Sequence, residues 1–318
     1  MPLRNIALPN NSLRKTIALD IGGTGIKAAV ALHEGGKITL LEKVRGDNQS
    51  NTLEWVSSHV AEIIEGYLKS ADEINSVGIA TTGSVNLQGV ITESSFFQGY
   101  VGFRWEDFLT RRFPGINKVF TINDVQAASL GVFKCDPAIG DNPSLFHISV
   151  GTGVGGGVIS EGKLFRGANS LAGNIAHVKI GRGERRLCPC KNFDCMETYA
   201  SGSGIQTSVK NRLGLELSLR EIVARMEEPA IADLIASAGK ALGDALGSVM
   251  SLIDPGVISI GGGIIDATWK NHSNIYLDSA IETAKATAMP ETAEKTRIIP
   301  TTLGNEANLY GAAILSIS

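Results

Sequence analysis

Apolar residues along the chain follow two different spacings, which alternate from segment to segment. Residues 16–21 and 145–150 are short apolar segments typical of buried strands, and each leads directly into a cluster of glycines. Residues 27–32 and 37–44 continue as strands. Residues 53–68 instead carry apolar side chains three and four positions apart, which predicts an amphipathic helix. This alternation of strands and helices predicts an α/β fold.

The rest of the chain shows the same alternation. Residues 230–253 have helical spacing, and the predicted helix ends at Asp254 and Pro255. Further strands are expected at 77–80, 119–122, 257–260 and 297–303, and further helices at 125–133, 276–288 and 305–317. The unit of strand, glycine turn and strand occurs twice, about 130 residues apart, and this suggests two related halves.

Length and charge narrow the possible functions. A length of 318 residues suggests two domains, at roughly 150 residues each. The 29 basic and 32 acidic residues give a net charge of −3, and since no run of Lys or Arg occurs, we expect no binding to nucleic acid. No apolar stretch approaches the ~20 residues of a membrane span or resembles the core of a signal peptide. We therefore expect a cytoplasmic protein with no membrane partner.

Glycine is in excess, with 37 residues in the chain, and part of this excess is clustered behind predicted strands. Three clusters are candidate phosphate-binding loops: Asp20 with Gly22, Gly23, Thr24 and Lys27; Gly151, Thr152, Gly153 and Gly155; and Gly261, Gly262 and Gly263. Backbone N–H groups in such loops hold phosphate oxygens. One loop alone could equally be a tight turn, whereas three together predict a nucleotide site. The P-loop pattern is absent, and the first two clusters join strand to strand, which argues against a Rossmann unit.

A candidate metal site lies within the second half of the chain. Cys188, Cys190 and Cys195 fall within eight residues, and His177 precedes the first of them by eleven positions. Three thiolates and one imidazole form the usual closed, tetrahedral site of structural Zn²⁺, which leaves no position for a catalytic water. The alternative is a loop that carries four unligated side chains.

Four motifs therefore occur together: Asp20-Ile21-Gly22-Gly23-Thr24 with Lys27, the pair Asn123-Asp124, the glycine segment at 151–157, and the His/Cys cluster. In combination they resemble the ROK family of sugar kinases (repressor, open reading frame, kinase), from about residue 16 to residue 318. The resemblance implies an actin-like ATPase fold, which is ribonuclease H-like, with two α/β domains around a central cleft. We expect a small N-terminal α/β domain at 1–122, completed by the helix at 304–318, and a larger α/β domain with the zinc-binding loop at 123–303.

The resemblance also implies roles for individual residues in an ATP-dependent transfer that uses Mg²⁺. Asp124 is the expected general base, since kinases commonly use a carboxylate to accept the hydroxyl proton; the alternative for this residue is a helix N-cap. Asp20 is expected on the side of the metal and the nucleotide. ATP would lie between the first two glycine clusters, with the third near the adenosine. The residues expected to bind the sugar are Gly83, Asn123, Asp124, Asn174, His177 and Glu197.

The sequence departs from the family pattern in two places. Asn174 and Ala176 replace the Glu and the Gly of the common motif Glu-x-Gly-His. An amide both donates and accepts hydrogen bonds, whereas a carboxylate only accepts, so the pocket must recognise a different set of groups or the same sugar less tightly. Lys191 and Asp194 stand where the family usually has glycines beside the last two cysteines, and the loop could therefore bend differently.

The identity of the sugar is less constrained. The N-acetylmannosamine kinases of some bacteria also lack the Glu, and the segments at 80–83 and 170–173 are similar to that subgroup. The segment at 93–100 is more similar to β-glucoside or related hexose kinases, and its Phe96, Phe97 and Tyr100 could line the sugar pocket or pack in the core. We expect phosphorylation of a hexose or an N-acetylated amino sugar at the 6-hydroxyl, with N-acetylmannosamine first and a glucokinase or β-glucoside kinase as the alternative.

Partners and rival functions follow from the same motifs. The family is often homodimeric, which implies a homodimer here, and zinc is expected to be coupled to sugar binding through His177 and Glu197. A non-catalytic sugar sensor or transcriptional regulator is the alternative of another class. Only 19 residues precede Asp20, which is too few for a helix-turn-helix domain, so we expect no DNA-binding domain.

Overall fold

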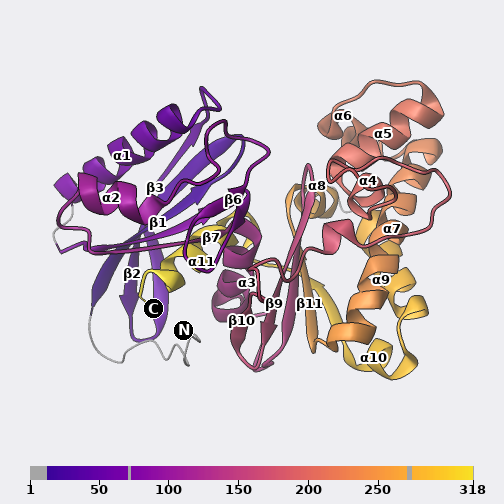
Figure 1. Cartoon of the computed structure of the whole chain (residues 1–318). Helices are drawn as coiled ribbons and strands as arrows, with labels where there is room; N and C mark the ends of the chain where they lie inside the picture. The colour runs from indigo at the N-terminus through magenta and orange to yellow at the C-terminus, as the bar shows by residue number, and fades with distance from the viewer. Residues whose placement is uncertain (1–12, 71–72, 271–273, 318) are drawn as a thin grey trace. The chain divides into compact units, whose positions relative to one another are not determined.

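The computed structural model describes residues 13–70, 73–270 and 274–317 (Figure 1). The chain separates into two compact units. Unit 1 consists of Met1–Pro137, Gly157–Ala172 and Asn305–Ser318, and unit 2 of Ala138–Gly156 and Gly173–Gly304. The domain limits expected from the sequence, 1–122 with 304–318 and then 123–303, remain a prediction. Among the described residues, no helix has both the length and the apolar character needed to cross a membrane.

A sheet in unit 1 places the ends of three strands at one edge. Its strands run in the order β3-β2-β1-β4-β7, at Lys37–Asp47, Gly25–Glu34, Arg14–Ile21, Ser76–Thr81 and Lys118–Asn123. β1 is antiparallel to β2 and parallel to β4, and β4 is parallel to β7. The register pairs Ile21 with Thr81 and Thr81 with Asn123, so these three strand ends lie side by side. Ligands of parallel α/β sheets commonly bind beyond such ends.

Helices cover both faces of this sheet (Figure 1). They are α1 (Leu53–Ser70), α2 (Trp105–Arg112), α3 (Asp124–Cys135) and α11 (Ala307–Leu315), and the hairpin β5 (Ser84–Val85) and β6 (Ile91–Glu93) follows β4. Ile17 and Leu19 share a core with the buried residues of α1 and α2. Because successive strand residues point to opposite faces, Asp20 points to the other face, where α11 packs on α3 and β4. A Cβ at Gly78 would lie 1.8 Å from the carbonyl oxygen of Ala312, so glycine permits this close packing.

A second sheet repeats the strand order of the first. Its strands are β8 (Leu145–Val150), β9 (Val154–Ser160), β10 (Lys163–Phe165), β11 (Val257–Gly261) and β12 (Arg297–Pro300), in the order β10-β9-β8-β11-β12. If the strands of each sheet are numbered as they occur along the chain, both sheets have the spatial order third, second, first, fourth, fifth. β11 is parallel to β8 and to β12, as β4 is to β1 and β7. This shared topology agrees with the two related halves that the repeated motif suggests.

Close helix packing in unit 2 uses a stripe of glycines on its longest helix. The helices are α4 (Glu197–Ala200), α5 (Gly202–Leu213), α6 (Leu219–Ala224), α7 (Pro229–Ile253), α8 (Gly263–Lys270), α9 (Ile275–Thr287) and α10 (Pro290–Lys295), with the 3₁₀ turn η1 (Ile175–His177). A second 3₁₀ turn, η2 (Gly304–Glu306), begins at the last residue of unit 2 and continues into the final segment of unit 1. A Cβ at Gly239, Gly243 or Gly247 of α7 would lie 2.2, 2.6 or 2.0 Å from an atom of α9. Part of the glycine excess therefore serves packing and not ligand binding.

Candidate active site

The first glycine loop (residues 22–24) joins β1 to β2 and is held by a residue that the sequence did not single out. Asn48 donates from Nδ2 to the carbonyl oxygens of Gly22 (3.0 Å) and Gly23 (2.9 Å). Its own backbone N–H donates to the carbonyl of Thr24 at 2.9 Å. Asn48 thus fixes the loop along its whole length. No sequence pattern marked this residue, because it follows a largely exposed strand.

Asp20 is buried near the end of β1, two positions before this loop, and two side chains hold its carboxylate. Lys27 Nζ donates to Oδ2 at 2.9 Å, and Asn308 Nδ2 donates to Oδ1 at 3.0 Å. Lys27 also donates to the carbonyl oxygen of Asn305 at 3.2 Å. The pair of Asp20 and Lys27 balances one charge against the other at the start of the loop. Asn308 is a second residue that sequence reasoning missed, since it lies 288 positions from Asp20.

Asp124 begins helix α3 at the end of β7, but it is not the cap of that helix. Asn123 caps α3, because its Oδ1 accepts hydrogen bonds from the N–H groups of Val125 (3.0 Å) and Gln126 (3.2 Å). Asn123 Nδ2 donates to the carbonyl of Gly83 at 3.0 Å and to Asp124 Oδ1 at 2.8 Å. The capping alternative for Asp124 is therefore wrong. The structure places Gly83, Asn123 and Asp124 together at the edge where the parallel strands end.

The pKa of the Asp124 carboxyl is raised well above its ordinary value. Burial raises its pKa, the negative charge of Asp20 raises it further, and the result is about 7. Hydrogen bonds from Val125 and Asn123 act in the opposite direction but do not cancel the effect of burial. A carboxyl with a pKa near neutral pH can accept a proton and release it again, which is the property that a general base needs.

The segment after β6 does not present all its aromatic rings to a ligand. Phe97 is 4% exposed and Tyr100 is fully buried, so both pack in the core. Phe96 is 47% exposed and lies against the first glycine loop, where a Cβ at Gly23 would meet its ring at 2.2 Å. Gly83 has a φ of +91°, which side chains rarely adopt, and so glycine is required there.

In unit 2, the second glycine loop is shorter than expected. It spans residues 151–153, because β9 begins at Val154 and includes Gly155. Glu197 Oε2 accepts a hydrogen bond from the N–H of Val154 at 2.9 Å. A Cβ at Gly153 would lie 2.7 Å from the same oxygen, so the Glu197 carboxylate lies directly against the loop. Sequence reasoning placed Glu197 with the sugar and did not foresee this contact.

The third glycine cluster lies beside the second loop. Gly261 ends β11, and Gly263 begins α8. Between them, Gly262 has a φ of +102°, and a Cβ there would lie 2.4 Å from the carbonyl oxygen of Val150. Val150 directly precedes Gly151, so the structure brings these two clusters together within unit 2.

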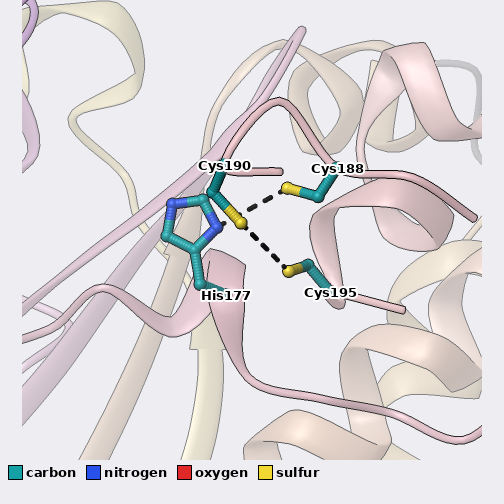
Figure 2. Close-up of side chains that lie close together, drawn as sticks. All are labelled: His177, Cys188, Cys190 and Cys195. Atoms are coloured by element: carbon teal, nitrogen blue, oxygen red, sulfur yellow. Dashed lines mark hydrogen bonds between the residues drawn. The ribbon is translucent and has the colours of Figure 1, made fainter. Parts of the chain in front are cut away.

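The predicted metal ligands converge in one place (Figure 2). The ligand atoms of His177, Cys188, Cys190 and Cys195 all lie within 4.8 Å of one another. Cys188 Sγ lies 3.7 Å from His177 Nδ1, and Cys190 Sγ lies 3.5 Å from Cys195 Sγ. A tetrahedral zinc ion with Zn–S bonds of about 2.3 Å separates its sulfur ligands by about 3.8 Å. The residues present therefore fit structural zinc in both chemistry and spacing.

The loop that carries these cysteines adopts the conformation that glycines would adopt. Lys191 has a φ of +67° and Asp194 a φ of +58°, both in the left-handed region. The Asp194 carboxylate accepts hydrogen bonds from the backbone N–H of Arg186 at 2.9 Å and from the Tyr199 hydroxyl. Lys191 and Asp194 thus adopt backbone conformations that glycine adopts readily, although neither is glycine. Nearby, Lys179 Nζ donates to Cys195 Sγ at 3.1 Å.

Residues 16–318 match the sequence pattern described as the ROK family. The chain belongs to the ROK family. Among its relatives, the glucokinase of Streptomyces coelicolor is 29% identical over 322 residues, which cover 95% of this chain and 97% of that protein. The N-acetylmannosamine kinase of Vibrio cholerae is 32% identical over 255 residues, which cover 79% of this chain and 84% of that protein.

Solved ROK structures confirm the fold. A ROK family glucokinase from Streptomyces griseus, crystallised in complex with glucose and AMPPNP, matches 95% of this chain and 99% of its own chain with a TM-score of 0.79 and 26% identity. The expected actin-like α/β fold is thereby confirmed. The chain is an ATP-dependent sugar kinase and not a non-catalytic sensor.

Proposed function

We propose that this ROK kinase transfers the γ-phosphoryl group of ATP to the 6-hydroxyl of N-acetylmannosamine. The observation that carries the choice of sugar is Asn174, which stands where the ROK pattern usually has Glu. Asn174 is exposed at the start of η1, and its side-chain amide makes no hydrogen bond with the described residues. The amide is therefore free to bind a ligand one short turn before His177.

The chemistry of an amide suits an N-acetyl group better than a carboxylate does. The acetamido group presents a carbonyl oxygen, which only accepts hydrogen bonds, and an N–H, which only donates. A carboxylate at position 174 would repel the carbonyl oxygen, whereas Asn174 can donate to it from Nδ2 and accept from the N–H at Oδ1. The similarity to the Vibrio cholerae N-acetylmannosamine kinase supports the same choice.

Each group of site residues has its own proposed role in the phosphoryl transfer. ATP with Mg²⁺ supplies the phosphoryl group and neutralises its charge. We assign Asp124 as the base that accepts the hydroxyl proton, while the Asn123 amide holds one of its carboxylate oxygens. Asp20 is proposed to orient Mg²⁺, directly or through water. The first and second glycine loops are proposed to hold the phosphates, with the third cluster near the adenosine.

Zinc and the oligomeric state belong to the same proposal. A structural zinc ion on the Cys/His cluster would fix the segment that carries His177 and Glu197, both proposed to contact the sugar. Such a fully ligated ion takes no part in the transfer itself. The homodimer implied by the resemblance remains a prediction, which light scattering on the purified protein tests.

The choice of sugar is tested with an ATP-coupled assay on the purified enzyme. The panel is N-acetylmannosamine, N-acetylglucosamine, glucose, mannose, fructose, allose and cellobiose. The highest kcat/KM is expected with N-acetylmannosamine, and NMR of the product should show the phosphate on O6. The matched variant N174E should lose about tenfold or more in kcat/KM with N-acetylmannosamine and should not lose activity with glucose.

Two results would count against this choice. The highest kcat/KM with glucose would favour the glucokinase alternative, which the similarity to the Streptomyces coelicolor enzyme over 95% of this chain supports. No transfer to any sugar of the panel would contradict the proposed substrate class as a whole.

A further inference from the structure

The contacts of Glu197 point away from a role limited to the sugar. Its Oε2 atom accepts the N–H of Val154 at 2.9 Å, where the second glycine loop ends. A Cβ at Gly153 would lie 2.7 Å from that oxygen, so the carboxylate occupies the space that a side chain on the loop would need. A carboxylate acceptor makes a stronger hydrogen bond to an N–H than a neutral acceptor does. Glu197 therefore restrains one end of the loop.

The start of helix α5 restrains the rest of the loop. The N–H of Gly202 donates to the carbonyl of Gly151 at 2.8 Å, and the N–H of Ser203 donates to the carbonyl of Thr152 at 3.2 Å. In a trans peptide group, the C=O of one residue and the N–H of the next point in opposite directions. Fixing these two carbonyls on α5 therefore turns the N–H groups of Thr152 and Gly153 away from α5. These two N–H groups are then presented together, as donors to an anion.

The segment 195–197, which ends in Glu197, begins at a cysteine of the Cys/His cluster. Glu197 follows Cys195 by two positions, and between them the N–H of Met196 donates to the carbonyl of Val178 at 2.8 Å. Val178 directly follows His177. A zinc ion bound to His177 and Cys195 would hold both sides of this backbone contact and, with them, the position of Glu197.

We propose that Glu197 is a positioning residue for the nucleotide, which fixes the second glycine loop so that its free N–H groups meet the phosphates, and that the zinc cluster fixes Glu197 in turn. This inference rests on the proposed function in one respect, namely that the second glycine loop holds nucleotide phosphates. It differs from that proposal because a residue that only binds sugar has no effect on nucleotide affinity when sugar is absent.

The test is calorimetric binding of Mg²⁺·AMPPNP to zinc-loaded enzyme without sugar. E197A is expected to weaken binding about tenfold, because the loop loses a charge-assisted hydrogen bond. E197Q should stay within about threefold of the wild type, since its amide oxygen accepts from the same N–H. The matched control E216A, which removes an exposed carboxylate paired with Lys210, should leave the affinity unchanged.

The direction of the change in AMPPNP affinity in E197A separates loop positioning from simple charge repulsion. Removing a negative charge near bound phosphates would by itself tighten nucleotide binding. Unchanged or tighter binding in E197A would therefore overturn the inference, whereas a wild-type enzyme that binds no AMPPNP would overturn the proposed function instead. Zinc removal by a chelator should weaken AMPPNP binding by the wild type and have little further effect on E197A. Equal losses in the two proteins would contradict the link between zinc and the loop.

Discussion

Replacing Asp124 by asparagine should stabilise the folded protein above neutral pH, although it removes the proposed base. The unfolded chain releases this proton near the ordinary pKa of 3.8, whereas the folded protein holds it up to about 7. Between these two values the folded state binds more protons than the unfolded state, so stability falls as the pH rises. Above pH 7 the full cost of the buried charge is present, at most about 4 kcal/mol.

The variant should keep the local structure, because an asparagine oxygen can accept the same hydrogen bonds from Val125 and Asn123. Asp124 is partly in contact with solvent, so screening should reduce the gain of D124N to about 2 kcal/mol at pH 8. Urea unfolding of both proteins at pH 8 and pH 5 measures this gain. At pH 5 it should fall to less than half, since the folded Asp124 is then protonated. Equal stability of the two proteins at pH 8, or a gain that does not shrink at pH 5, would refute the reasoning.

Three further predictions concern the base and the zinc loop. The kcat/KM for the sugar should rise about tenfold per pH unit below an apparent pKa of about 7 for Asp124 and then level off, and a flat profile from pH 5.5 to 8.5 would contradict its role. K191G should raise the free energy of unfolding by up to about 1 kcal/mol, because glycine adopts the left-handed conformation of residue 191 without strain. D194G should lower the free energy of unfolding, because the Asp194 carboxylate accepts two hydrogen bonds that glycine cannot replace. Urea unfolding should therefore show opposite changes in stability for the two variants. K179M should release zinc to a chromogenic chelator faster than the wild type or K179R, since its side chain can no longer donate to Cys195 Sγ, and equal release rates would disprove this support.

Hydrophobic spacing located most of the described strands but fewer than half of the described helices. A buried face imposes its own period on the sequence, so the helix predicted at 230–253 is found as α7 at Pro229–Ile253. Spacing identifies an element less well near its end, where burial stops. The strand predicted at 297–303 ends at Pro300 in β12, and the final helix begins at Ala307 after a 3₁₀ turn.

Glycine counts could not separate loops from packing. The second glycine segment was expected to be a loop over residues 151–157, but its last three glycines belong to β9. A Cβ at Gly156 would lie 2.5 Å from the carbonyl oxygen of Gly173, and one at Gly157 would lie 2.2 Å from Ser129 Oγ. A tight loop and close packing both favour glycine, so only the folded structure shows which of the two a given glycine serves.

Only those residues of the candidate site that belong to a local sequence motif could be predicted. The pair Asn123 and Asp124 and the metal ligands have short spacings, and the structure brings each group together. Asn48 and Asn308, which hold the first glycine loop and Asp20, contact partners distant in sequence and have no motif of their own. Which of Asn123 and Asp124 caps α3 also depended on backbone geometry, since both residue types are common caps.

The most direct test of the central claim compares phosphoryl transfer by the wild type and by D124N at pH 8, with N-acetylmannosamine and ATP, in enzymes shown to bind Mg²⁺·AMPPNP equally. The wild type should form N-acetylmannosamine 6-phosphate, and D124N should be slower by a factor of about 100 or more. A D124N enzyme with near-wild-type turnover, or a wild-type enzyme that forms no phosphorylated sugar, would contradict the account.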